Sequence, residues 1–171
     1  MAGLPSPTPH GVAQALDMHV QEQVVAAEAV LATLTARAPL RLVQVSIQGV
    51  RYALSPDLDV LRRNRSLLED VVMTALARHA AASMLGVPVV PGTPERDALD
   101  LLQSALVEPE EQSTIPDYVR VLEARARALL RRSWSEVQVV AAGLREHGAL
   151  DAEAVKHRIR CAQGIRGTLL N

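Results

Sequence analysis

The chain has 171 residues, the length of one ordinary domain and enough to bury a substantial apolar core. Its 18 basic and 19 acidic side chains nearly cancel, and with only two tyrosines and one tryptophan it lacks the charge and the stacking platform of a nucleic-acid-binding protein. A single cysteine excludes an internal disulfide, and the short apolar runs indicate neither a membrane span nor a signal peptide. We therefore expect a cytoplasmic protein with no nucleic-acid or membrane partner.

The chain starts with a segment that lacks helical periodicity. Residues 1–10 contain three prolines, which predicts a flexible arm ahead of a single domain over residues 11–171. From Gly11 to about Ala36, apolar residues recur every three or four positions. This spacing predicts a long amphipathic helix.

Strand signals follow this helix. Residues 42–47 combine β-branched side chains with partial alternation, Gly49 permits a turn, and residues 50–54 return as a second short strand. The segment 87–90, VPVV, is the other strand candidate. A small β-sheet or hairpin is therefore expected within an otherwise helical chain.

The rest of the sequence favours helices with recognisable ends. Ser133 stands three residues before Glu136 as in a capping box, Gly148 is a stop signal, and Asp151 is placed to cap the last helix. A lone cysteine in that helix, Cys161, is typical of a small buried apolar residue. A short helix is predicted to start at Ser55-Pro56-Asp57 and to break near residues 64–66. The helices predicted after it are 67–85, 95–108, 116–132, 134–147 and 151–162. The fold class is thus mainly α, of the α+β kind.

Motifs for several chemistries are missing. No two histidines stand four residues apart on a helix, no phosphate-binding glycine loop occurs, and no serine has a nucleophile-elbow context. Carboxylates remain. Glu28 interrupts the apolar face of the first long helix, and Asp97 and Asp100 lie at the start of the helix after the proline-rich segment, where an acidic side chain commonly serves as a cap.

The surroundings of Glu28 resemble a known family. The stretch VVAAEAVLATLTARAPLRLVQVSI, residues 24–47, resembles the zinc-binding helix and following strand of the FtsH-type metalloprotease domain. That family carries HExxH on this helix, with two histidines holding zinc and the glutamate activating water. The five positions here read Ala27-Glu28-Ala29-Val30-Leu31, so both histidines are replaced and the glutamate is kept.

Further segments match the family in the same order. ALARHAAASMLG, residues 75–86, resembles its glycine-terminated helix, and TPERDALDLL places Asp97 at the position of the third, carboxylate ligand. Residues 118–153 resemble the paired terminal helices of the protease domain. The resemblance runs from Val20 onward and implies a truncated, helical zincin-like FtsH protease-domain fold without the ATPase domain.

The departures from the family pattern decide what the resemblance implies about activity. A zinc protease needs three protein ligands and an open position, and one carboxylate cannot replace two histidines. We therefore expect an inactive remnant of a metalloprotease, with no metal, no cofactor and no catalytic residue.

Substrate binding can outlast the loss of zinc. Proteases of this kind hold an extended peptide on a strand edge, through main-chain hydrogen bonds that need no metal. Zinc-less relatives occur among the peptide-binding proteins of crocagin-type pathways, which tailor ribosomally made peptides. The resemblance thus implies a peptide-binding pseudoprotease of natural-product (RiPP) biosynthesis, with a precursor peptide as partner. The expected peptide-binding residues are Glu28, Leu42, Val43, Gln44, Val45, Ser46, Ile47, Gln48, Arg51, Tyr52 and Asp97.

Two alternatives stay open. The chain could be a structural subunit that forms a homodimer, or a heterodimer with a protease-like homologue or a tailoring enzyme. Alternatively, Glu28 could act as the general base of a non-proteolytic enzyme, with its pKa raised by the surrounding cleft.

Overall fold

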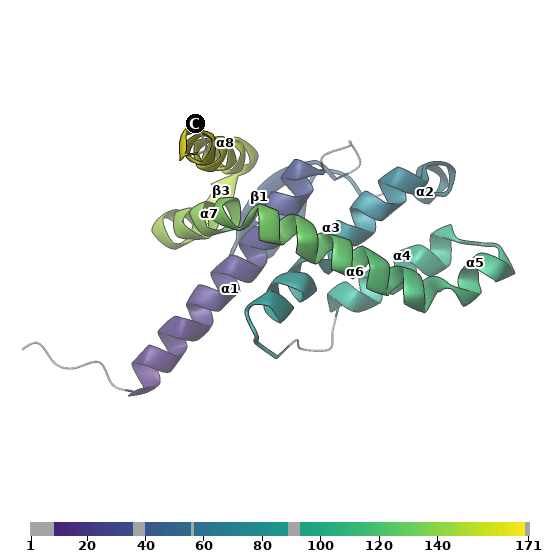
Figure 1. Cartoon of the computed structure of the whole chain (residues 1–171), viewed down its shortest axis with the longest axis horizontal. Coiled ribbons are helices and arrows are strands. Elements are labelled where there is room, and N and C mark those ends of the chain that lie inside the picture. The colour runs from purple at the N-terminus through teal and green to yellow at the C-terminus, as the bar shows by residue number, and fades with distance from the viewer. Residues whose placement is uncertain (1–8, 36–39, 56, 89–92, 170–171) are drawn as a thin grey trace, which may run out of the picture.

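The computed structural model describes residues 9–35, 40–55, 57–88 and 93–169, and it is mainly helical with one small antiparallel sheet (Figure 1). The elements in chain order are α1 (Pro9–Leu34), β1 (Leu42–Ser46), β2 (Gly49–Tyr52), α2 (Leu58–Arg63), α3 (Arg65–Met84), α4 (Thr93–Ala105), α5 (Pro109–Ser113), α6 (Ile115–Arg132), α7 (Trp134–His147), β3 (Ala149–Asp151) and α8 (Ala152–Leu169). The predicted mainly α class is confirmed.

Two helices form the centre of the molecule. α1 packs against α3 and α7, and α3 packs in turn against α4 and α6. Small side chains are fully buried on both central helices, with Ala26, Ala27 and Ala29 in α1 and Ala77 and Ala80 in α3. Small residues let helix backbones approach closely, so this alanine-rich contact brings α1 and α3 together.

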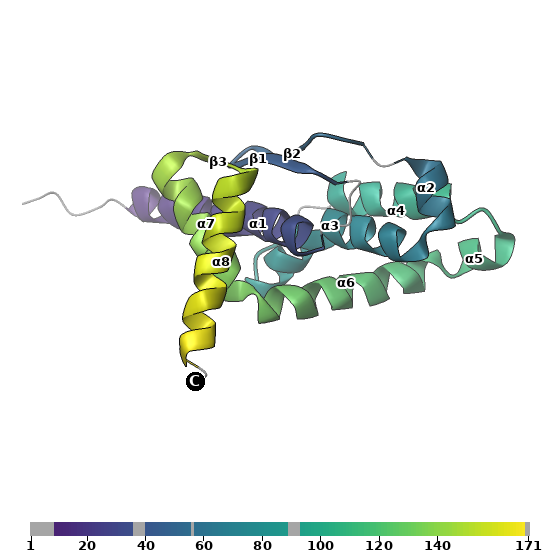
Figure 2. The same ribbon diagram turned by 90° about the horizontal axis from the view of Figure 1, so that it is seen from above.

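The sheet covers one side of this helical layer. Figure 2 shows α1 and α3 between the sheet and α6, with the far end of α8 projecting away from the other helices. The strand order is β2-β1-β3, and both pairs are antiparallel. Val50, Val45 and Leu150 form one row across the three strands, and Val45 and Leu150 are buried. This row faces the helices.

Local sequence signals explain several element ends. The Asp57 side chain accepts a hydrogen bond from the Asp59 amide at the start of α2, and the Asn64 side chain accepts one from Leu67 at the start of α3. Gly148 ends α7 with a φ of 76°, a conformation that favours glycine. Asp151 accepts from the amide of Ala154 and caps α8 as predicted.

Some expectations differ from the structure. Ser133 makes no side-chain capping bond; its N–H bonds to the carbonyls of Leu129 and Leu130, and the Glu136 carboxylate accepts from Ser135 and Arg166. Cys161 is exposed rather than buried, and its sulfur lies 3.6 Å from Nε2 of His157. Pro9 and His10 belong to α1, while the rest of the predicted arm lies outside the described residues. In the predicted strand 87–90, residues 87 and 88 are not in a strand, and 89 and 90 lie outside the described residues.

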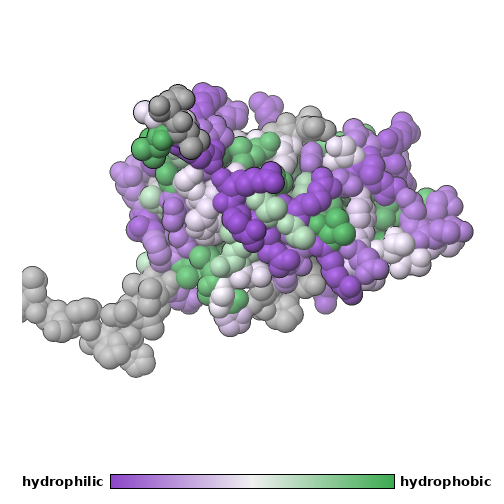
Figure 3. All heavy atoms as spheres, in the orientation of Figure 1, coloured by the Kyte–Doolittle hydropathy of each residue, from purple (hydrophilic) through white to green (hydrophobic). Residues whose placement is uncertain are grey.

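The face formed by α6 and α7 is largely polar. Figure 3 shows hydrophilic side chains over much of this face, with smaller apolar areas between them. Arg120 and Asp117, for example, form an ion pair on α6 in which both side chains are mostly exposed. The polar face of α6 thus points to solvent on the side opposite the sheet (Figure 2).

Candidate functional site

Glu28 is a carboxylate in the most buried part of α1. Its neighbours Ala27 and Ala29 are fully buried, and the Glu28 side chain itself is only 14% exposed. A carboxylate withdrawn from water in this way needs hydrogen bonds and a counter-charge from the protein. The structure supplies both.

Tyr52 and Arg78 are the partners of Glu28. The Tyr52 hydroxyl, at the end of β2, donates a hydrogen bond to Oε1 of Glu28 over 2.9 Å. Nε of Arg78, in α3, donates to Oε2 and forms an ion pair with it. We call Glu28, Tyr52 and Arg78 the Glu28 clamp. Because its members come from α1, β2 and α3, the clamp ties the β-hairpin to the central helices.

The Tyr52 phenol is a fixed hydrogen-bond donor in this clamp. Burial raises the pKa of Tyr52 far above its ordinary value, and the negative charge of Glu28 and the hydrogen bond to it act in the same direction. The positive charge of Arg78 opposes this rise only in part. The phenol therefore stays protonated at physiological pH and keeps donating to Glu28.

The clamp leaves Glu28 poorly suited to catalysis or zinc binding. Both carboxylate oxygens already accept a hydrogen bond, whereas a general base needs an oxygen within reach of the proton it removes. Zinc does not fit here, because Ala27 and Leu31 offer no donor atom and the Arg78 guanidinium holds the carboxylate where a cation would bind. Within the described residues, no group of three His, Cys, Asp or Glu side chains could hold a metal ion.

Arg78 also reaches the turn between β1 and β2. A Cβ atom built on Gly49 would lie 2.9 Å from Nη2 of Arg78, and Gly49 has a φ of 148°. Both the close contact and the backbone conformation favour glycine. The absence of a side chain at Gly49 therefore leaves room for the guanidinium that binds Glu28.

The structure brings together only part of the predicted peptide-binding set. The hairpin contains Leu42–Ser46 as β1, Ile47 and Gln48 as the turn, and Arg51 and Tyr52 in β2. Asp97 is exposed on α4, a helix that packs against α2, α3 and α6, and it makes no hydrogen bond or ion pair with the clamp. Asp97 is therefore not a member of the Glu28 clamp.

The prediction that Leu42–Gln48 is an exposed strand edge is wrong. β1 is the central strand, because residues 44–46 pair with β2 on one side and with β3 on the other. β2 is an edge strand, and among the described residues its backbone is bonded only to β1. β3 has only three residues, too few to show the alternation that predicts a strand. Any peptide added beside the clamp would therefore pair with β2.

The partnership between Arg78 and Glu28 was not visible in the sequence. Arg78 follows the fully buried Ala77, so a lone positive charge interrupts a buried stretch of α3, as Glu28 interrupts one in α1. The two residues are 50 positions apart. Two isolated opposite charges on apolar helices are a signal that could have suggested the pair, but only the packing of α1 on α3 joins them.

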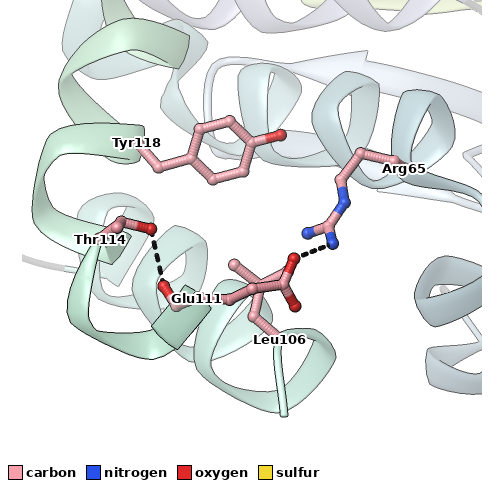
Figure 4. Close-up of a pocket in the computed structure, with 5 residues that line it drawn as sticks. All are labelled: Arg65, Leu106, Glu111, Thr114 and Tyr118. Atoms are coloured by element: carbon pink, nitrogen blue, oxygen red, sulfur yellow. Dashed lines mark hydrogen bonds and ion pairs between the residues drawn. The ribbon is translucent and has the colours of Figure 1, made fainter. Parts of the chain in front are cut away.

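A second candidate site is a pocket of about 260 Å³ where α3 begins and α6 begins (Figure 4). It is lined by Arg65, Leu106, Glu111, Thr114 and Tyr118. Arg65 pairs with Glu111 across the pocket, and the Tyr118 hydroxyl donates to Glu69, which also accepts from Arg125 over 2.6 Å. These charged groups already bind one another, so the lining does not select a ligand.

Both tyrosines of the chain are expected to resist alkaline titration. Burial and the hydrogen bond to Glu69 raise the pKa of Tyr118 to about 12, and the pKa of Tyr52 is raised as well. We expect no phenolate absorbance at about pH 10.5 in the native protein, but half-titration near pH 10 in guanidinium chloride. Since the folded pKa of Tyr118 is raised, the contribution of this phenol to stability is present below about pH 10 and is lost as the pH rises through about 12, whereas that of Tyr52 is lost only at still higher pH. Half-titration of the native protein near pH 10 would contradict this, and Tyr118→Phe identifies the first phenol to ionise.

No helix in the described parts of the chain is long and apolar enough to cross a membrane. The resemblance to FtsH-type domains stays a prediction. No protein-family model matches the chain, and no curated protein is similar to it in sequence.

Proposed function

We propose that this protein is a non-catalytic, peptide-binding pseudoprotease that holds an extended segment of a peptide against the outer edge of β2. The Glu28 clamp carries this proposal. Glu28 stands where the resembled family has its water-activating glutamate, yet here it is bound by Tyr52 and Arg78. The carboxylate position of a protease would thus serve to secure the strand on which a peptide is held.

The order of elements supports the finer fold assignment within this proposal. The helix that carries Glu28 is followed by β1, then by α3 with Arg78, and later by α6 and α7. These elements overlap the segments 24–47, 75–86 and 118–153, which resemble the FtsH-type domain in the same order. A fold of this kind would keep the cleft beside the sheet while its metal chemistry is lost.

The edge of β2 offers a short set of backbone groups. In an antiparallel pair only every second residue directs its N–H and C=O groups outward, so Gly49–Tyr52 presents two such residues. Each backbone hydrogen bond contributes about 0.5–1.5 kcal/mol, and association itself is costly. We therefore expect binding through this edge to be weak.

The clamp prepares this edge for binding. Tyr52 is fixed to Glu28, and Val50 packs against the buried core, so β2 is ordered before a peptide arrives. An ordered edge lowers the entropy lost on binding. A ribosomal precursor peptide suits this mode of binding, because an extended peptide has free backbone N–H and C=O groups. A peptide that is bound without being cleaved also remains available to tailoring enzymes.

Backbone N-methylation tests this mode of binding. The probe is a fluorescein-labelled nonapeptide of alternating valine and glutamine, measured by fluorescence polarisation in three forms: unmodified, methylated on the valine amides, and methylated on the glutamine amides. Only one set of amides can face β2. We expect that set, when methylated, to weaken binding at least tenfold, and the other to change it less than about twofold. A slip of one residue cannot rescue binding, since it would turn the valines to the solvent face.

Amide hydrogen exchange locates the bound peptide. Residues 49–52 should exchange more slowly when the unmodified peptide is present, while residues 149–151 at the opposite edge serve as the internal control. Equal effects of the two methylated peptides, or protection at 149–151 alone, would contradict addition to β2.

A further inference from the structure

The outward face of the hairpin carries positive charge. The pairing of the strands places Arg51, Gln44 and Asp151 in one row across the sheet, in alternation with the buried row that contains Val45. Arg51 is exposed. Figure 2 shows the sheet at the surface of the molecule, with helices on one side only. The Arg51 side chain therefore lies on the solvent face of an edge strand.

Arg41 adds a second charge beside the same edge. Its backbone carbonyl accepts a hydrogen bond from the amide of Ala53 over 2.8 Å, so Arg41 lies next to the end of β2. Arg41 and Ala53 are both exposed. Ala53, which lies beside Arg41 at the end of β2, has only a methyl group as its side chain.

These two arginines lack a counter-charge in the described parts of the chain. Neither forms an ion pair or a hydrogen bond through its side chain there, whereas Arg78 pairs with Glu28. No acidic residue occurs between positions 40 and 54. The carboxylate of Asp151 belongs to the row of Arg51 but lies on the far side of β1, where it caps α8.

We propose that the peptide held at β2 is acidic, with carboxylate side chains at the alternate positions that face Arg51 and Arg41. This inference rests on the proposed function and specifies its partner. Directly opposed residues of neighbouring antiparallel strands lie on the same face and interact when oppositely charged. With strands about 4.8 Å apart, a glutamate opposite Arg51 meets its guanidinium, and a glutamate beside Ala53 comes within reach of Arg41.

The test compares three fluorescein-labelled nonapeptides in which valine alternates with glutamate, glutamine or lysine. At low salt we expect the affinity to fall in the order glutamate, glutamine, lysine, by about threefold at each step, because exposed ion pairs are individually weak. At 0.5 M salt the three affinities should converge, because screening removes the charge effect. Arg51→Glu combined with Arg41→Glu should reverse the order.

A matched control separates local charge from net charge. Arg131 is exposed on α6, on the side of the helical layer opposite the sheet, and it has no ion-pair partner among the described residues. Arg131→Glu should leave the order of the three peptides unchanged. If Arg131→Glu weakens the glutamate peptide as much as Arg51→Glu does, the local assignment is overturned.

The outcomes distinguish this inference from the proposed function. Equal affinity for all three peptides overturns the acidic preference and leaves peptide binding intact, whereas saturable binding of none of them overturns both. A single-stranded DNA oligonucleotide is included as a polyanion without a peptide backbone. If it binds as tightly as the glutamate peptide, the surface selects charge alone and the proposal of an acidic strand is wrong.

Discussion

Replacing Arg78 by glutamine is expected to lower the free energy of unfolding by about 2–3 kcal/mol. The change removes the counter-charge of Glu28, whose side chain is only 14% exposed, and leaves a desolvated carboxylate with the Tyr52 hydroxyl alone. The loss falls below that of a fully buried pair because the Arg78 side chain is 27% exposed. Urea unfolding followed by the fluorescence of Trp134, the single tryptophan, measures the effect.

A double-mutant cycle tests whether the two charges act together. Glu28→Gln should cost less than Arg78→Gln, because the guanidinium can turn toward water, and the double variant should cost less than the sum of the two. The control is Arg120→Gln, whose ion pair with Asp117 is 78% and 80% exposed and should contribute at most about 0.5 kcal/mol. If Arg78→Gln were as mild as Arg120→Gln, the clamp would not stabilise the fold.

Replacing Arg166 by alanine should lower the free energy of unfolding by about 2 kcal/mol at the other end of the molecule, because Glu136 is fully buried although the Arg166 side chain is 43% exposed. Nη2 of Arg166 donates to Oε1 of the fully buried Glu136 over 2.6 Å, and Nη1 donates to the carbonyl of Arg132 over 2.7 Å. Without Arg166, the Glu136 carboxylate keeps only the hydrogen bond from Ser135. Urea unfolding measures the loss, and amide exchange should show that α8 frays from about Gly164 onward.

The neighbouring Arg160 provides the control for this prediction. It is exposed on the same helix and has no ion-pair partner in the described residues, so Arg160→Ala should change stability by less than about 0.5 kcal/mol. Adding Glu136→Gln to Arg166→Ala should recover part of the loss, since an amide is less costly to bury than a charge. A double variant less stable than Arg166→Ala would show that desolvation of Glu136 is not the cause.

The parts of the fold that could be predicted from the sequence are those set by neighbouring residues, above all the ends of helices. Asn64 combines the break after α2 with the cap of α3, and Gly148 and Asp151 mark the passage from α7 to α8, so these boundaries follow from neighbouring residues. The Ser133 capping box does not form. The Ser133 amide already bonds to the carbonyls of Leu129 and Leu130 at the end of α6, and the Glu136 carboxylate binds Arg166, which lies 30 positions away in the sequence. α5 has five residues and no buried one, so it leaves no periodic pattern to detect.

The candidate site shows the same division. Glu28 could be predicted as a site residue because its charge interrupts an apolar helix face, and Tyr52 was among the residues expected near it. The role of Arg78 and the free edge of β2 depend on contacts between distant segments: α1 packing on α3, and β3 pairing with β1. The periodicity of a helix does not show which other segment it packs against. The hairpin could therefore be predicted from the sequence, but the exposed edge was predicted at β1 and lies at β2.

The assembly of the sheet has a consequence for synthesis of the protein. β1 meets β2 after a two-residue turn, but Ser46 pairs with Ala149 only after all the helices from α2 to α7 have intervened. A nascent chain on the ribosome therefore carries β1 with one side uncovered until β3 emerges. Uncovered strands of this kind invite pairing between chains. Truncated chains that end before Gly148 should therefore aggregate, because β3 covers one side of β1 in the folded protein.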